Sequence, residues 1–277
     1  MTTTRDFSLA MLERLLLTFK ESGHQFVRFH DYYQNRELFD KQDRVVLFRH
    51  DVDRYPATAL ATAKLQAGHG LLGTYYFRAK PWTLKPAIIK AIADLGHEIG
   101  YHYECLPDCG GDFDAAAELF KANLKKMRAY APITTASMHS RPLSRWDGRR
   151  LWDRFSLEQF GLLGEAYRSI DHYRYTYLPD SGRNWKANRN VVWDSVQGSS
   201  PPDMTNGTNG LIEAITNGRI NTVQLLIHPN RWPSGFVGWM SQSLQDSAIN
   251  TIKNIVRRLR GGTGAITMPS SDRHSTR

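Results

Sequence analysis

Two carboxylates and an imidazole crowd one short stretch, His50-Asp51-Val52-Asp53, directly after the apolar run 45–48. Carboxylates at such a position are suited to accepting protons or binding a metal ion, and Asp is disfavoured inside strands. In α/β proteins, ligands and chemistry collect at the carboxyl ends of the strands. An Asp-rich turn that caps a helix near Pro56 would explain the same residues, and this stretch alone does not decide between the two interpretations.

Three further strand-like segments each end in a histidine: His102, His139 and His228. Because parallel strands place their carboxyl ends at one edge of a sheet, we expect these imidazoles to meet Asp51 and Asp53. Two or three imidazoles with one carboxylate suit a divalent metal such as zinc, with an open position for water. A second carboxylate would act as general base, and a further histidine would protonate a leaving group. These residue types predict metal-assisted hydrolysis of an amide or ester.

Strand-like and helical segments alternate along the chain, which predicts parallel strands joined by helical crossovers. We expect a distorted (β/α) barrel of about seven strands in a single domain, residues 1–260, followed by a flexible tail, 261–277. The Gly-, Ser-, Pro- and Asn-rich region 179–210 is expected to be a loop over the barrel mouth. Expected helices cover 8–21, 56–67, 85–95, 113–130, 149–160 and 238–260; expected strands cover 25–29, 45–48, 73–77, 98–103, 134–138, 190–194 and 222–227.

Composition excludes several classes of protein. The 277 residues are 41% hydrophobic, which indicates a packed core, and no apolar run is long enough to span a bilayer. The N-terminus lacks the layout of a secretory signal, and Cys105 and Cys109 fit no common zinc spacing, so we expect a cytoplasmic protein. The net charge of +9 has no zinc-finger, RNA-recognition or phosphate-loop motif beside it, so nucleic-acid binding is not expected.

Five segments follow one another along the chain, at residues 50–53, 96–102, 137–142, 180–185 and 226–229. Taken in order, they resemble the motifs of the polysaccharide deacetylases, the NodB-homology group of carbohydrate esterases (family 4-like). The chain looks most similar to their O-antigen-cluster branch, whose members are linked to surface-polysaccharide synthesis. The resemblance implies a distorted barrel, a divalent metal and removal of an N- or O-acetyl group from a sugar or glycan precursor, nucleotide-linked, lipid-linked or polymeric. The motifs are His50–Asp53, Gly96-His97-Glu98-Ile99-Gly100-Tyr101-His102, Ser137–Pro142, Asp180–Trp185 and Leu226-Ile227-His228-Pro229.

The resemblance also implies roles for individual residues. Asp51 matches the catalytic base, His102 the first histidine ligand and His228 the late histidine that acts as general acid. The metal-binding aspartate falls on Val52, so Asp53 takes that role. The second histidine ligand falls on Leu106, which cannot bind metal. Either His139 or Glu104 would supply the missing metal ligand, and we favour His139.

Three residues are expected to bind substrate. Arg141 would hold an anionic group or, as the resemblance suggests, orient Asp51. Asp180 and Trp185 would line the sugar site, although Trp185 would equally well anchor its loop as a buried ring. His97 is expected to be structural, and His50 to orient Asp51 or to pack in the core.

Two other functions remain open from the sequence. Leu106 in place of a histidine would suit a sugar-binding barrel that has lost its metal and its activity. A hydrolase of a non-sugar C–N bond would use the same residues.

Overall fold

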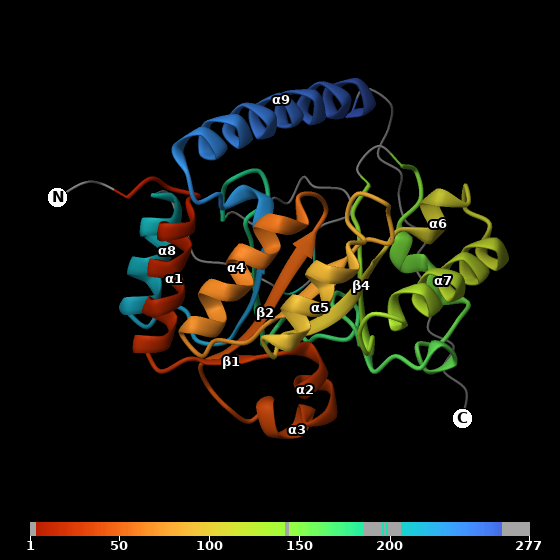
Figure 1. Cartoon of the computed structure of the whole chain (residues 1–277), viewed down its shortest axis with the longest axis horizontal. Helices are drawn as coiled ribbons and strands as arrows, with labels where there is room; N and C mark the ends of the chain where they lie inside the picture. Colours follow the sequence, from red (N-terminus) through yellow and green to blue (C-terminus); the bar gives the residue numbers. More distant parts are fainter. Residues whose placement is uncertain (1–3, 142–143, 186–195, 197, 199–205, 262–277) are drawn as a thin grey trace.

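The protein is built around one curled parallel sheet with helices packed against it (Figure 1). The computed structural model describes residues 4–141, 144–185, 196, 198 and 206–261. The sheet order is β6-β5-β4-β3-β2-β8-β7, and β1 pairs with β2. The strands are β1 (Gln25–Val27), β2 (Val45–Val52), β3 (Thr74–Phe77), β4 (Glu98–Tyr103), β5 (Thr135–Met138), β6 (Gly164–Glu165), β7 (Thr176–Pro179) and β8 (Val223–Ile227).

All pairings between these strands are parallel. No pairing joins the edge strands β6 and β7 among the described residues, so the sheet forms an open half-barrel. The predicted distorted (β/α) barrel of about seven strands is therefore confirmed as a curled, incompletely closed one. Parallel pairing also gathers the carboxyl ends of the strands at one edge, as the sequence predicted.

The helices connect and cover the strands. Figure 1 shows α4 and α5 in front of the sheet, α1 and α8 side by side, and α9 along the side toward which the β2 arrow points. The longer helices are α1 (Leu9–Glu21), α4 (Pro56–Gly68), α5 (Pro86–Asp94), α7 (Phe113–Arg128), α8 (Gly207–Thr216) and α9 (Phe236–Gly261); the short ones are α2 (Phe29–Gln34), α3 (Arg36–Phe39), α6 (Cys105–Asp108) and the 3₁₀ turns η1 (Gly148–Asp153), η2 (Glu158–Phe160) and η3 (Pro229–Arg231).

Local sequence accounts for most of these elements. All eight residues of β2 are buried, as expected of a central parallel strand covered on both faces. Ser8 and Asp112 cap α1 and α7 by accepting backbone N–H groups, and Pro56 occupies the first turn of α4. Tyr55, in a left-handed conformation just before Pro56, turns the chain sharply between β2 and α4.

Several expected boundaries are wrong. The helix expected at 149–160 is two 3₁₀ segments, η1 and η2, and the loop expected at 179–210 contains the first residues of α8. The strand expected at 190–194 and the tail residues 262–277 lie outside the described residues. In the described part of the chain, no helix is long and apolar enough to cross a membrane.

Strand alternation decides which side chains enter the half-barrel. On β2, Arg49 and Asp51 point toward the interior, where Asp51 lies near His102. His50 points the other way, to the α4 side, where it stacks on Tyr75 and contacts Gln66. The same alternation puts Glu98 and His102 of β4 inside, at opposite ends of the strand.

Candidate metal centre

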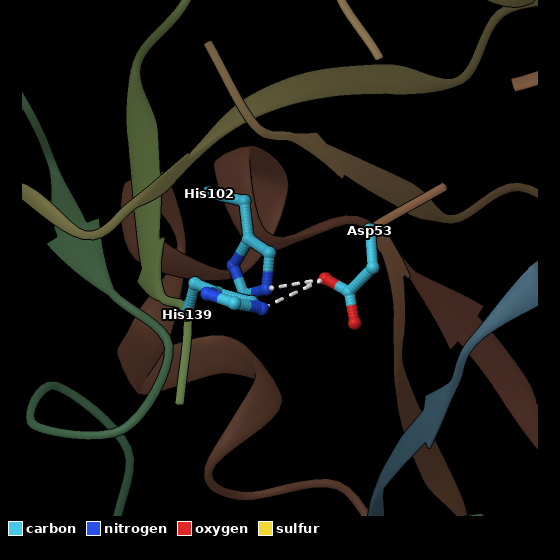
Figure 2. A group of neighbouring side chains, drawn as sticks. All are labelled: Asp53, His102 and His139. Carbon is cyan, nitrogen blue, oxygen red and sulfur yellow. Dashed lines mark ion pairs between the residues drawn. The ribbon is translucent and has the colours of Figure 1, made fainter. Parts of the chain in front are cut away.

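Asp53, His102 and His139 converge at the carboxyl edge of the sheet (Figure 2). They come from the turn after β2, from β4, and from the residue that follows β5. Asp53 Oδ1 lies 3.3 Å from His102 Nε2 and 3.5 Å from His139 Nε2. The three ligand atoms lie within 4.8 Å of one another, close enough for one ion to contact all of them.

In each imidazole, the nitrogen that points away from Asp53, Nδ1, donates a hydrogen bond that fixes the orientation of the ring. His102 Nδ1 donates to the backbone oxygen of Ser137 at 3.0 Å, and His139 Nδ1 donates to Glu104 Oε2 at 3.0 Å. A carbonyl or carboxylate oxygen can only accept, so both Nδ1 atoms carry hydrogen and both Nε2 atoms present lone pairs when the rings are neutral. This anchoring is the arrangement that metal-bound histidines use.

One carboxylate oxygen of Asp53, Oδ1, faces the Nε2 atoms of both imidazoles. Asp53 Oδ1 is buried and has no hydrogen-bond partner among the described residues. Burial alone would raise the pKa of Asp53, but His139, His102 and His228 together hold it well below its usual value. Burial lowers the pKa of His139 in spite of Asp53 and Glu104, which favours the neutral ring. Burial would lower the pKa of His102, but Asp51 and Asp53 raise it. With both rings neutral, the Asp53 carboxylate and the two Nε2 atoms are three electron-pair donors that face one another and fit a divalent cation such as zinc.

Asp51 lies beside this group, held by a neighbour on its own strand. Arg49 donates from Nε to Asp51 Oδ1 at 2.8 Å and from Nη2 to Asp51 Oδ2 at 2.7 Å. Both side chains are buried, and the Arg49 guanidinium lies 4.3 Å from the centre of the Tyr167 ring. His102 Nε2 is 3.4 Å from Asp51 Oδ2. A bidentate, buried pair of this kind fixes both the charge and the orientation of the carboxylate.

Sequence reasoning missed Arg49. The signal was its position two residues before Asp51, because residues i and i+2 share one face of a strand. Arg141, which was expected to orient Asp51 or to bind substrate, pairs with Asp108 at 2.6 Å and lies 3.9 Å from Glu104; its side chain is 40% exposed, and substrate binding by it stays a prediction. Orientation of Asp51 by Arg141 is therefore wrong, and Arg49 makes that contact.

His228 reaches the centre from β8, the strand that pairs with β2 on the side away from β3 and β4. Its Nδ1 donates to Asp180 Oδ1 at 2.6 Å, which leaves Nε2 3.8 Å from Asp53 Oδ2. Asp180 also accepts from Arg231 Nη1 at 2.7 Å and from Trp232 Nε1 at 2.8 Å. Burial would raise the pKa of Asp180, but Arg231 and His228 lower it to about 2. The ionised Asp180 therefore fixes the ring orientation of His228.

Two expected substrate contacts do not hold in the structure. Asp180 is completely buried behind His228, so it orients that histidine and has no free face for a sugar. Trp185 is 1% exposed, packs against Phe7 and Trp232, and donates to Thr208 Oγ1. Its indole offers no open face to a ligand, and the alternative, a buried anchor, describes it correctly.

Glu104 lies behind His139, not in the ligand group. Its Oε1 accepts from Arg78 Nη2 at 2.6 Å and lies 3.2 Å from Lys80 Nζ, while Oε2 accepts from His139. Burial opposes ionisation, but His139 and Arg78 hold the pKa of Glu104 well below its usual value. The geometry therefore favours His139 over Glu104 as the third ligand, with Glu104 as the anchor of that histidine.

The remaining titratable candidates lie in the core. His97 Nε2 contacts the backbone oxygen of Ala63, and its Nδ1 accepts from the Gly73 amide, so this histidine is structural. Cys105 is buried against Tyr101 and has its pKa raised by burial to about 12, so it is no ligand at neutral pH. Leu106 is completely buried in the core.

The chain has similarity to known proteins at the level of solved structures. No family model matches the chain, and no curated protein sequence matches it. Among solved structures, the chain is similar to the peptidoglycan deacetylase PdaC from Bacillus subtilis, with 13% identity and a TM-score of 0.39 over 79% of this chain and 98% of that one. An identity and a TM-score this low do not support assigning roles to individual residues, so the assignment of the metal centre rests on its geometry alone.

Proposed function

We propose that this chain is a metal-dependent deacetylase of the polysaccharide deacetylase superfamily. Its substrate would be an acetylated sugar in surface-polysaccharide synthesis of the O-antigen type. The observation that carries the proposal is the convergence of Asp53, His102 and His139 between a buried carboxylate, Asp51, and an oriented imidazole, His228. A metal, a base and an acid at these three places are what hydrolysis of an amide or ester requires.

Asp53 Oδ1, His102 Nε2 and His139 Nε2 would hold the metal. When bound, a divalent ion polarises the acetyl carbonyl and lowers the pKa of water. Glu104 and the backbone of Ser137 keep the two rings in the tautomer that can bind it. Zinc, which binds such sets of imidazole and carboxylate ligands in hydrolases, is the ion that we propose.

Asp51 would accept the proton of the attacking water. The Arg49 guanidinium holds both of its oxygens, so the carboxylate cannot rotate away from the centre. His228 Nε2 would deliver a proton to the departing amine nitrogen or alkoxide oxygen, while Asp180 holds its Nδ1–H. A base that activates water and an acid that protonates the leaving group are the two proton-transfer roles that addition to the acetyl carbonyl and collapse of the tetrahedral intermediate require.

Acetate release by the metal-loaded chain tests this proposal. The substrates are a panel of nucleotide-linked, lipid-linked and polymeric sugars with N- or O-acetyl groups, with non-sugar amides for comparison. We expect Asp51→Asn to lower kcat by about 10²–10⁴-fold, since it removes the general base, and to leave metal binding intact. His97→Gln, a change in the structural histidine, is the matched control.

Two outcomes would contradict the proposal. Full activity of Asp51→Asn on a verified substrate would show that Asp51 is not the general base. Sugar binding by a chain that takes up no metal and releases no acetate would favour a non-catalytic sugar-binding barrel. The proposed setting is the cytoplasm, consistent with the two free thiols, Cys105 and Cys109.

A further inference from the structure

Helix α9 carries a stripe of large apolar side chains on its outer surface. Phe236, Val237, Met240 and Leu244 are 53%, 74%, 46% and 68% exposed, respectively. Positions 236, 240 and 244 are four residues apart, so their side chains lie along one face of the helix. We call these four residues the apolar stripe.

Over residues 236–247, where the structure describes the side chains, the face of α9 that packs on the protein is polar instead. Gln242 and Asp246 are buried, and Gln242 Nε2 donates to Asp246 Oδ1 at 3.0 Å. Asp246 lies 3.8 Å from Arg183, and Trp239 donates from Nε1 to the backbone oxygen of Asp6 at 2.8 Å. A surface helix normally buries its apolar face and exposes its polar one. The reversed arrangement indicates that the apolar stripe contacts a partner.

The positive charge near the apolar stripe indicates the chemistry of the partner. Arg5 lies over the Phe236 ring at 4.6 Å, which puts a cation beside the apolar stripe. The sequence of α9 contains Lys253, Arg257, Arg258 and Arg260, and its one acidic residue, Asp246, faces the protein. A basic amphipathic helix with an exposed apolar face is typical of helices that lie in the headgroup region of a membrane.

We propose that α9 binds the surface of a bilayer that contains acidic lipids. The apolar stripe inserts among the headgroups, and the positive charge of Arg5 and of the α9 sequence attracts the acidic lipids. A second copy of this chain would bring a second set of positive charges to the same face, so charge favours the lipid surface. The helix would lie in the plane of the membrane surface and would not cross it.

The position of α9 connects this contact to the candidate centre. The helix packs against η3, the turn that directly follows His228 and contains Arg231. Figure 1 shows α9 on the side toward which the β2 arrow points, the carboxyl edge of the sheet. Membrane binding through α9 would hold that edge close to the bilayer and give access to a lipid-linked sugar. This last consequence rests on the proposed function, whereas the membrane contact does not.

Vesicle co-sedimentation of the full chain tests the proposal. The probes are vesicles of phosphatidylcholine alone and vesicles with about one third phosphatidylglycerol. We expect binding to the acidic vesicles to be stronger by roughly fivefold for each basic residue near the surface, and to fall as salt rises. The double variant Met240→Ser/Leu244→Ser should reduce binding at least about tenfold, because it removes two apolar groups from the stripe.

Leu38→Ser/Leu163→Ser is the matched control, since these leucines are 56% and 46% exposed elsewhere on the surface. It should bind like the unchanged chain, and circular dichroism should show that both variants are folded. Equal binding to the two vesicle types, or equal loss in both variants, would overturn the proposal. So would absence of vesicle binding together with a dimer that Met240→Ser/Leu244→Ser converts to monomer, because the stripe would then join two copies. None of these readouts depends on deacetylase activity.

Discussion

Asp53 and Glu98 are two carboxylates at opposite ends of the same half-barrel, and they are satisfied in opposite ways. Glu98 Oε2 accepts from Thr74 Oγ1 at 2.6 Å and from the His30 amide at 2.8 Å, and Oε1 accepts from Thr135. Asp53 Oδ1 is just as inaccessible to solvent, yet it faces two imidazole nitrogens and no hydrogen-bond donor of the described chain. Low solvent access to an oxygen therefore does not distinguish the two carboxylates; what differs is that the Glu98 oxygens accept hydrogen bonds from the protein and Asp53 Oδ1 accepts none from the described residues.

The comparison predicts different consequences of neutralising each carboxylate. Asp53→Asn should weaken zinc binding by roughly 10³-fold, because the binding free energy of about 10–16 kcal/mol at a zinc site is shared among few ligands. Glu98→Gln should leave the affinity unchanged. Titration calorimetry with a competing chelator measures the zinc affinity of both variants. An equal loss of zinc affinity in Asp53→Asn and Glu98→Gln would contradict the difference between the two ends of the half-barrel.

Glu104→Gln should have the next largest effect. The amide holds the His139 ring less firmly and makes its Nε2 less basic, so metal affinity should fall about 10–100-fold. Asp108→Asn is the matched control, since Asp108 pairs with Lys80 and Arg141 but lies outside the bonds that hold His139. If the two variants bind metal equally well, Glu104 does not anchor the centre.

The smallest expected effect is on the pH dependence of stability. Burial raises the pKa of Glu98 above its usual value, against the hydrogen bonds from Thr135 and Thr74. The folded state therefore binds this proton more tightly than the unfolded state does. The stabilisation is complete below the unfolded pKa of about 4.3 and is lost as pH rises through the higher folded pKa.

Urea unfolding at several pH values checks this linkage. The unchanged chain should lose stability with rising pH relative to Glu98→Gln, which has no proton to release. A difference in stability between the two chains that stays constant with pH would mean that Glu98 has the same pKa in the folded and unfolded states, and would contradict this linkage.

The sequence allowed the sheet and the ligand group to be predicted because both depend on local pattern. Apolar runs that end in Asp51, His102, His139 and His228 required only that the strands be parallel. Trp185 and Asp180 were placed wrongly because their exposure depends on tertiary packing, against Trp232 and behind His228. Arg49 was missed although strand alternation pointed to it. Helix α8 was missed because its Gly- and Asn-rich start is typical of a loop.

A zinc-edge anomalous difference map from crystals of the metal-loaded chain tests the central claim most directly. We predict one peak per chain, in contact with Asp53 Oδ1, His102 Nε2 and His139 Nε2, and no peak at that place in crystals of Asp53→Asn. A peak on Glu104 in place of His139 would contradict the ligand assignment. No peak at the carboxyl edge, in crystals that contain saturating zinc, would contradict the metal centre itself.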